Sequence, residues 1–231
     1  MKFQFILLSL CLLLGCEKSA TQNMTKPTNS TSLTYLALGD SYTIGEAVTA
    51  QESFPYQLVS QLKGQGFSFD APKIVAKTGW TTDELKAAIK AENITQTFDV
   101  VTLLIGVNNQ YRGYSETTYR KEFKELLQTA LTFARGNKSR VFVVSIPDWG
   151  VTPFGKNSGK DIKIIAQQID AFNAINKEET LAMGVSYTDI TAGSRVASTD
   201  TSLIAKDGLH PSGKMYGEWV SALLPSIKKA L

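Results

Sequence analysis

The chain has 231 residues, with 24 lysine and arginine residues against 21 aspartate and glutamate residues, a net charge of +3, two cysteines and one histidine. This near balance, with no dense basic run, excludes the charge pattern of a nucleic-acid-binding protein. Both cysteines lie within the first sixteen residues, which excludes cysteine catalysis and cysteine-based metal sites in the remainder of the chain.

The first fifteen residues are typical of a bacterial export signal. A basic start, Met1-Lys2, precedes an apolar run from Phe3 to Leu14, which is shorter than the ~20 residues needed to span a bilayer. The run ends at Leu13-Leu14-Gly15-Cys16, which resembles the lipobox of bacterial lipoproteins. This resemblance implies cleavage before Cys16 and lipidation of that residue. The alternative is an ordinary signal peptide in which the cysteine occurs by chance.

Residues 17–32 are polar and lack apolar periodicity, which predicts a flexible tether. The expected organisation is a lipoprotein signal over 1–15, a tether over 16–32 that begins at the lipidated Cys16, and one folded domain over 33–231. The lipid would attach the protein to a membrane of the bacterial cell envelope, facing the periplasm or at the outer membrane. Glu17 follows the cysteine and leaves the choice of membrane open.

From residue 33 onward, apolar strand-like runs alternate with amphipathic helical stretches, several of the runs being unbroken and β-branched. The predicted strands are Leu33–Leu38, Lys73–Lys77, Asp99–Ile105, Arg140–Ile146 and Val185–Thr188. The predicted helices are Phe54–Leu62, Thr82–Ala91, Glu116–Ala134, Ile162–Met183 and Pro211–Lys229, the last with proline in its first turn. This alternation predicts a three-layer α/β/α sandwich around a five-stranded parallel sheet.

Short unusual motifs follow the predicted strands. Because ligands of open parallel sheets bind beyond the carboxyl ends of the strands, we expect these motifs to meet at one edge. In chain order they are Gly39-Asp40-Ser41, Gly79-Trp80, Gly106-Val107-Asn108, Pro147-Asp148-Trp149-Gly150 and Asp207-Gly208-Leu209-His210.

Three residues in these motifs suit nucleophilic catalysis. Ser41 has the ordinary alternative of a helix N-cap, but at a strand end its hydroxyl lies near unpaired backbone N–H groups. His210 is the sole imidazole, and Asp207 is close enough in sequence to accept its Nδ1–H and leave Nε2 as a base. The alternative for this pair is a surface turn.

Two further residues suit the stabilisation of an oxyanion. Gly79 is either a turn glycine with positive φ or a backbone N–H donor. Asn108 is either a turn residue or a side-chain amide donor. Together with the Ser41 N–H they would supply three donors, and the loss of one such donor typically lowers turnover by 10²–10³.

Taken together, these residues resemble the SGNH (GDSL) hydrolase family, whose signature residues are Ser, Gly, Asn and His in separate blocks. The blocks here are Gly39-Asp40-Ser41-Tyr42, Lys77-Thr78-Gly79-Trp80, Ile105-Gly106-Val107-Asn108-Asn109 and Asp207-Gly208-Leu209-His210-Pro211. The resemblance implies a flavodoxin-like SGNH hydrolase fold, Ser41 as nucleophile, His210 as base and Asp207 as its orienter. It also implies an oxyanion hole of Ser41 N–H, Gly79 N–H and Asn108 Nδ2.

One departure from the family lies at Asn109, where aspartate is frequent; we expect it to alter loop support or substrate contacts and not the oxyanion donor. Aromatic residues near the loops are candidates to line a pocket or to stack on a sugar, or else they pack in the core. Trp80, Tyr111 and Trp149 are the main ones, beside Tyr114 and Phe154. We expect Asp148 to be an exposed loop carboxylate without an assigned role.

The sequence thus predicts a lipid-anchored serine esterase, a monomer that needs no metal and no organic cofactor and acts on short-acyl or O-acetyl esters. A lysophospholipase or thioesterase for longer acyl chains is an alternative, since the family includes both. A non-catalytic surface lipoprotein that binds glycan or lipid is another. A flavodoxin-like phosphate site at Gly39–Gly45 is disfavoured because the chain lacks the glycine-rich phosphate-binding motifs.

Overall fold

The computed structural model describes Met1 and residues 32–231. Apart from Met1, the predicted signal lies outside the described residues, as do Cys16 and all but the last residue of the predicted tether. Among the helices that the structure does describe, none has the length and apolar character needed to cross a membrane.

Five parallel strands form the sheet, in the order β2-β1-β3-β4-β5. Their bounds are β1 Tyr35–Gly39, β2 Lys73–Ala76, β3 Val100–Leu104, β4 Val141–Val144 and β5 Ser186–Thr188. Each lies within the stretch predicted for it or one residue beyond it, so the predicted five-stranded parallel sheet is confirmed. Leu33, placed in the first strand, instead forms an isolated bridge with Phe69.

Burial follows the position of each strand in the sheet. Every residue of β1, β3 and β4 is buried, because these inner strands are covered on both faces. The edge strands β2 and β5 each have only one buried residue. The alternating pattern of a half-exposed sheet is therefore absent from the inner strands, in agreement with their unbroken apolar sequences.

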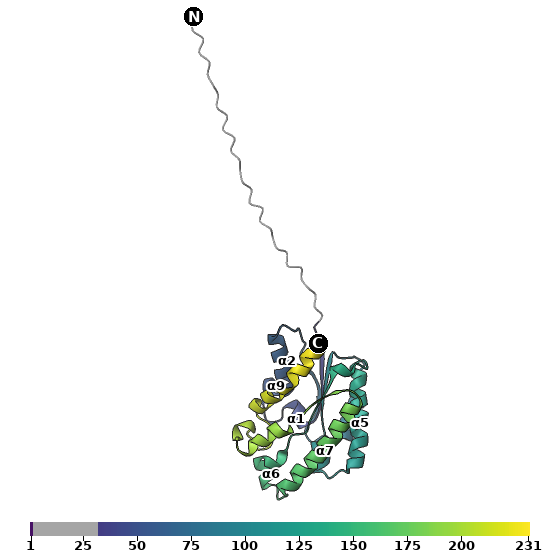
Figure 1. The fold of residues 1–231 in the computed structure, drawn as a ribbon, viewed down its shortest axis with the longest axis vertical. Coiled ribbons are helices and arrows are strands. Elements are labelled where there is room, and N and C mark those ends of the chain that lie inside the picture. The colour runs from purple at the N-terminus through teal and green to yellow at the C-terminus, as the bar shows by residue number, and fades with distance from the viewer. Residues whose placement is uncertain (2–31) are drawn as a thin grey trace. The chain divides into compact units, whose positions relative to one another are not determined.

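Helices cover both faces of the sheet (Figure 1). The helices α2 (Phe54–Gly64) and α9 (Gly213–Ala230) pack together in one layer, and α5 (Glu116–Phe133) packs against both α3 (Thr82–Glu92) and α7 (Ile162–Ala182) in the other. Shorter helices occupy the loops: α1 Ser41–Ile44, α4 Val107–Tyr111, α6 Pro153–Asn157, α8 Thr191–Ser194, and 3-10 turns at Ala50–Glu52, Lys138–Arg140, Trp149–Val151, Arg195–Ser198 and Thr201–Leu203.

Local capping signals fix where the helices begin. Helix α3 starts with a capping box in which Thr81 and Glu84 exchange hydrogen bonds, and the Ser115 hydroxyl caps α5 by accepting from the Thr118 N–H. The start predicted for the last helix is wrong. Ser212 caps α9, and Pro211 lies before it in an antiparallel bridge with Ile204, so the proline is not in the first turn.

The strand order creates a switch point beside β1. Strand β2 pairs with one edge of β1, and β3 pairs with the opposite edge of β1. Loops that leave β1 and β3 therefore diverge to opposite faces and open a crevice beyond their carboxyl ends. Ser41 follows β1 and Asn108 follows β3, so both residues lie at this crevice.

Candidate active site

Ser41 is the first residue of α1, and Asp40 alone separates it from the end of β1. Asp40 caps this helix, and its Oδ1 accepts a hydrogen bond from the Tyr42 N–H at 3.0 Å. A glycine is required two residues before Ser41, because a Cβ at Gly39 would lie 2.1 Å from Thr43 Oγ1 and 2.4 Å from the Leu104 carbonyl. The tight strand-to-helix passage thus places the serine hydroxyl at the end of the sheet.

His210 and Asp207 form a hydrogen-bonded pair on the loop before α9. His210 Nδ1 lies 2.5 Å from Asp207 Oδ2, and because a carboxylate only accepts, the hydrogen belongs on Nδ1. Asp207 Oδ1 accepts from the N–H groups of Leu209 and His210 at 3.0 Å each. Partial burial acts to raise the pKa of Asp207, but these hydrogen bonds outweigh it and the pKa lies below its usual value.

The two candidate oxyanion donors lie on facing loops. Gly79 has φ of +85° in the turn after β2, a conformation that favours glycine. Asn108 lies on α4, and its Nδ2 donates to the Trp80 carbonyl at 3.0 Å. An amide nitrogen carries two hydrogens, so this bond fixes the direction of the side chain and leaves one hydrogen for a ligand.

The residues predicted from separate segments line a single pocket. Ser41, Gly79, Asn108 and His210 all contribute to its wall, and its volume is about 190 Å³. A larger hollow of about 410 Å³ lies between α3 and α5, but its lining contains neither serine nor histidine. The smaller pocket is therefore the one whose lining residues can carry out nucleophilic catalysis.

Aromatic side chains form one side of this pocket. Tyr111, Trp149 and Phe154 line it, with ring centroids 5.4 Å apart for Tyr111 and Trp149 and 6.1 Å apart for Trp149 and Phe154. Tyr111 and Phe154 are 44% and 41% exposed, whereas Trp149 is buried. The ammonium group of Lys160 lies 4.1 Å from the centre of the Tyr111 ring.

Trp80 does not share this role, and the expectation for it is corrected. Its side chain packs against the hydrophobic core and is absent from the pocket lining. Tyr114 also lies elsewhere, with its hydroxyl 3.4 Å from Asp83 Oδ1. The aromatic wall comes from the loops after β3 and β4 and not from the loop after β2.

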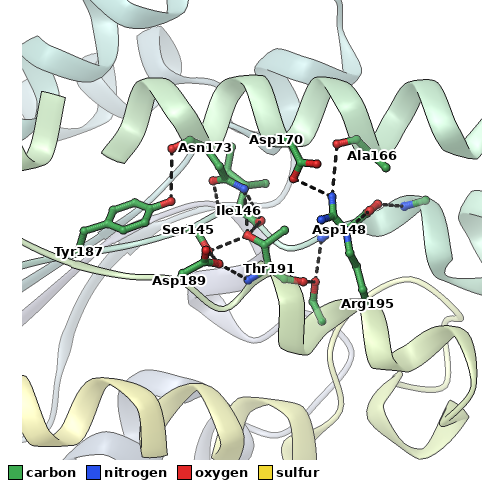
Figure 2. A network of polar contacts seen from close by, with 12 residues as sticks. Ser145, Ile146, Asp148, Ala166, Asp170, Asn173, Tyr187, Asp189, Thr191 and Arg195 are labelled. Atoms are coloured by element: carbon green, nitrogen blue, oxygen red, sulfur yellow. Dashed lines mark hydrogen bonds and ion pairs between the residues drawn. The ribbon is translucent and has the colours of Figure 1, made fainter. Parts of the chain in front are cut away.

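The expectation of an exposed Asp148 is wrong, since this carboxylate is buried. Its Oδ2 accepts from Arg195 Nε at 2.9 Å, and its Oδ1 accepts from the Gly150 N–H at 2.9 Å. Figure 2 shows Arg195 between Asp148 and Asp170 of α7, with the Ala166 carbonyl beside it. The ion pair anchors the loop that carries Trp149, because Asp148 also caps the turn containing that tryptophan.

Asn109 links two of the site loops. It is fully buried; its Oδ1 accepts from the Thr82 N–H at 3.0 Å, and its Nδ2 donates to Thr82 Oγ1 at 2.7 Å. The Thr82 hydroxyl in turn donates to Glu122 of α5. Asn109, which stands where aspartate is frequent in the family, thus supports the loops, and its side chain does not line the pocket.

Sequence reasoning gave no role to several residues that contact the site, among them Tyr42 and Arg112. The ring of Tyr42 lies edge-on to His210 with 5.6 Å between centroids, and it also contacts Trp219 of α9. Arg112 donates to the Gly79 carbonyl at 2.6 Å. The position of Tyr42 next to Ser41 was a signal for its role, whereas no local pattern connects Arg112 to a turn 33 residues earlier.

A model of the GDSL-like lipase/acylhydrolase family matches residues 37–217, from β1 into α9. The chain belongs to this family. As a GDSL-like hydrolase it is a serine hydrolase of carboxylic esters. The matched range includes every residue predicted for catalysis, for the oxyanion hole and for the pocket lining, and only Cys16 falls outside it.

Solved structures share the fold of this GDSL-like hydrolase. A lipase/acylhydrolase from Enterococcus faecalis is 19% identical with a TM-score of 0.66, over 85% of this chain and 96% of that chain. TesA is 18% identical with a TM-score of 0.67, over 86% and 99%. The acetylxylan esterase Axe2 from Geobacillus stearothermophilus is 19% identical with a TM-score of 0.63, over 84% and 94%. No curated protein matches the chain in sequence.

Proposed function

We propose that this hydrolase is an esterase for short-acyl or O-acetyl esters, with Ser41 as nucleophile, His210 as general base and Asp207 as the residue that orients the histidine. One observation carries the proposal: Ser41 and His210 line the same pocket, and Asp207 holds Nδ1 of that histidine. This arrangement keeps the hydrogen on Nδ1 and leaves Nε2 free to accept a proton.

The reaction has two halves. In the first, His210 Nε2 takes the proton of the Ser41 hydroxyl as Oγ bonds to the ester carbonyl carbon, and the carbonyl oxygen becomes an anion. The N–H groups of Ser41 and Gly79 and the amide of Asn108 would stabilise this oxyanion. The anion collapses, and the alcohol departs with the proton from His210. In the second half, water attacks the acyl-enzyme by the same route and releases the acid.

The size of the pocket supports a small acyl group. Its volume of about 190 Å³ lies below the range of roughly 300–1,000 Å³ in which drug-sized ligands bind. The aromatic wall of Tyr111, Trp149 and Phe154 suits the flat face of a sugar or an aromatic alcohol. The fold shared with an acetylxylan esterase agrees with an O-acetylated glycan, and longer acyl chains remain the alternative substrate class.

Replacement of the nucleophile tests the catalytic proposal. We expect Ser41→Ala to lower the turnover of p-nitrophenyl acetate by at least ~10³, because the acyl-enzyme cannot form. Ser221→Ala is the matched control and should retain full activity, since this exposed serine on α9 donates to the Gly217 carbonyl of its own helix and does not line the pocket. A fluorophosphonate probe should label the wild type and not Ser41→Ala. Turnover by Ser41→Ala close to that of the wild type would refute the assignment.

An acyl-chain series tests the substrate class. We expect kcat/KM for p-nitrophenyl esters to be highest for acetate or propionate and to fall beyond butyrate, because the pocket is small. Acetylated glycans and lysophospholipids measured in parallel separate the two substrate classes. A rate that rises with chain length, together with lysophospholipid cleavage, would favour the long-chain alternative. A folded protein that the probe does not label would favour the non-catalytic binding protein.

We further propose that the protein is anchored in the bacterial envelope through lipid on Cys16. The support is the sequence Leu13-Leu14-Gly15-Cys16 at the end of an apolar signal. Cys16→Ser should move the protein from the membrane fraction to the soluble fraction. Cys11→Ser is the matched control, because this cysteine lies inside the signal and should have no effect. Unchanged partitioning of Cys16→Ser would exclude this anchor.

A further inference from the structure

The turn after β2 is held by hydrogen bonds at both ends of one peptide group. The Trp80 N–H donates to the Lys77 carbonyl at 3.2 Å, which closes a turn with Gly79 in its third position. Gly79 has φ of +85° while Thr78 does not have positive φ, which is the pattern of a type II turn. The Gly79 carbonyl, in the same peptide group as the Trp80 N–H, accepts from Arg112 Nη2 at 2.6 Å.

This geometry matters for the direction of the Gly79 N–H. That N–H belongs to the central peptide of the turn, between Thr78 and Gly79. Type I and type II turns differ in the orientation of this central peptide, and glycine tolerates both conformations at little steric cost. The glycine also leaves the backbone of the turn free to move, so the position of the Gly79 N–H depends on how firmly the turn is held. A contact from outside the turn that holds the adjoining Gly79–Trp80 peptide would restrict this movement.

Arg112 supplies such a contact, and its own position is fixed. Its Nη1 donates to Glu84 Oε1 at 3.1 Å while Nη2 holds Gly79, so the planar guanidinium bridges two partners. Glu84 is held in turn by the capping box of α3, where its Oε2 accepts from the Thr81 N–H at 2.9 Å. The chain from α3 through Glu84 and Arg112 to the Gly79 carbonyl is continuous.

The same contact ties Gly79 to the other candidate oxyanion donor. Arg112 ends α4, and its N–H donates to the carbonyl of Asn108 at 3.0 Å. From the same short helix, Asn108 holds the Trp80 carbonyl and Asn109 holds Thr82. Three side chains of the α4 segment therefore clamp three residues of the facing loop. Of these contacts, the bond from Arg112 is the one made to the oxyanion glycine itself.

We propose that the Arg112 guanidinium, by bridging the Gly79 carbonyl and Glu84, is a positioning residue that keeps the Gly79 N–H directed at the oxyanion. The inference rests on the proposed function, since it needs the Gly79 N–H to act in that role. Arg112 does not line the pocket and needs no contact with substrate. Its effect is thus on the transition state, in which the oxyanion exists, and not on binding of the ester.

The matched experiment compares Arg112→Met with Arg120→Met. Both arginine side chains are 42% exposed and both make ion pairs with glutamates, but among the described residues Arg120 bonds only to Glu178 and Glu179 of α7. With p-nitrophenyl acetate, we expect Arg112→Met to lower kcat about tenfold or more and to change KM less than about twofold, since a donor is loosened and not deleted. Arg120→Met should keep the wild-type kcat, and the Tm of the two variants should be similar.

Chemical rescue separates positioning from general destabilisation. Millimolar guanidinium should restore part of kcat to Arg112→Ala in a saturable way and should leave Arg120→Ala unchanged. Arg112→Lys should have intermediate kcat, because one ammonium cannot bridge both partners as the guanidinium does. A kcat of Arg112→Met within twofold of that of Arg120→Met, a wild-type kcat for Arg112→Lys, or a loss without any rescue would overturn the inference.

Failure of this inference is distinguishable from failure of the proposed function. If Ser41→Ala is inactive and Arg112→Met retains full kcat, only the role of Arg112 is refuted. If Ser41→Ala is as active as the wild type, the catalytic assignment itself is refuted, and with it the reason for holding the Gly79 N–H.

Discussion

At the residue scale, the two carboxylate oxygens of Asp207 have different roles, one in the loop backbone and one at the histidine. One oxygen accepts from the backbone N–H groups of Leu209 and His210 and so shapes the loop, while the other oxygen fixes the imidazole. The loop is further tied to the aromatic wall, because the Phe154 N–H donates to the Gly208 carbonyl at 2.9 Å. Burial acts to raise the pKa of Asp207, but its hydrogen bonds hold the pKa below its usual value and so favour the ionised carboxylate.

We expect Asp207→Asn to lower kcat by roughly 10²–10⁴. The amide oxygen still accepts from the backbone, but the amide nitrogen facing Nδ1 forces the hydrogen of His210 onto Nε2, where it blocks the base. Steady-state kinetics with p-nitrophenyl acetate measure the loss.

Asp200→Asn is the control for that substitution. Asp200 caps a similar turn by accepting from the Ser202 N–H at 3.0 Å, and it pairs with Lys214 on the surface. Its replacement should leave kcat unchanged. Equal kcat for the two variants would mean that the carboxylate of Asp207 does not orient the histidine.

At the scale of elements, the site depends on contacts between short helices and the ends of long ones. The Thr82 hydroxyl at the start of α3 accepts from Asn109 of α4 and donates its one hydrogen to Glu122 of α5. In this series of hydrogen bonds it is therefore fixed which group donates and which group accepts. The amide at position 109 is required here, because a carboxylate has no hydrogen to offer.

We expect Asn109→Asp to destabilise the protein by about 1–3 kcal/mol at neutral pH, although aspartate is frequent in the family at this position. Two carboxylates would then face one hydroxyl that has a single hydrogen. Adding Glu122→Gln should recover much of the loss, since the new amide can donate to Thr82 Oγ1 and release its hydrogen for the carboxylate. Urea unfolding of the single and double variants measures this coupling, and strictly additive free energies would exclude the shared hydroxyl as the cause.

At the scale of the whole molecule, the buried Asp40 couples global stability to pH. Burial raises its pKa to about 7, against the opposing hydrogen bond from the Tyr42 N–H. Its usual value of 3.8 applies when the chain unfolds. Between about pH 4 and pH 7 the folded state therefore holds more protons than the unfolded state. The contribution of Asp40 to the free energy of unfolding accordingly falls as the pH rises through this window.

We expect Asp40→Asn to remove this dependence. The amide oxygen can still cap α1, and the variant cannot ionise, so its stability relative to the wild type should increase from about pH 4 to about pH 7.5 by as much as a few kcal/mol. Asp207 has the opposite effect on stability, because its pKa is lower in the folded protein than in the unfolded chain. It stabilises the folded state when the pH lies above the usual pKa of aspartate, and this stabilisation is lost as the pH falls below that pKa. Urea unfolding above pH 4 thus isolates Asp40, and a constant difference across the window would contradict a buried ionisable oxygen at this position.

The secondary structure was accessible from sequence because it depends on local chemistry. Apolar β-branched runs gave the five strands, and spacing of three and four gave the five long helices to within two residues at each end. The short helices α4, α6 and α8 were not predicted, because four or five residues contain too few periodic positions. Pro211 was misplaced for a related reason: proline favours a helix start, but the Ser212 hydroxyl supplies a better cap one residue later.

The sequence by itself determined the alternation of strands and helices, the family, and the residue types that follow each strand. Only the tertiary structure decided that β1 lies between β2 and β3, that Tyr111 and Trp149 face the pocket while Trp80 does not, and that Asp148 is buried against Arg195. It also brought Arg112 to the Gly79 carbonyl. The physical reason is range: helix and strand patterns arise between residues a few positions apart, whereas these contacts join segments that meet only when the sheet assembles.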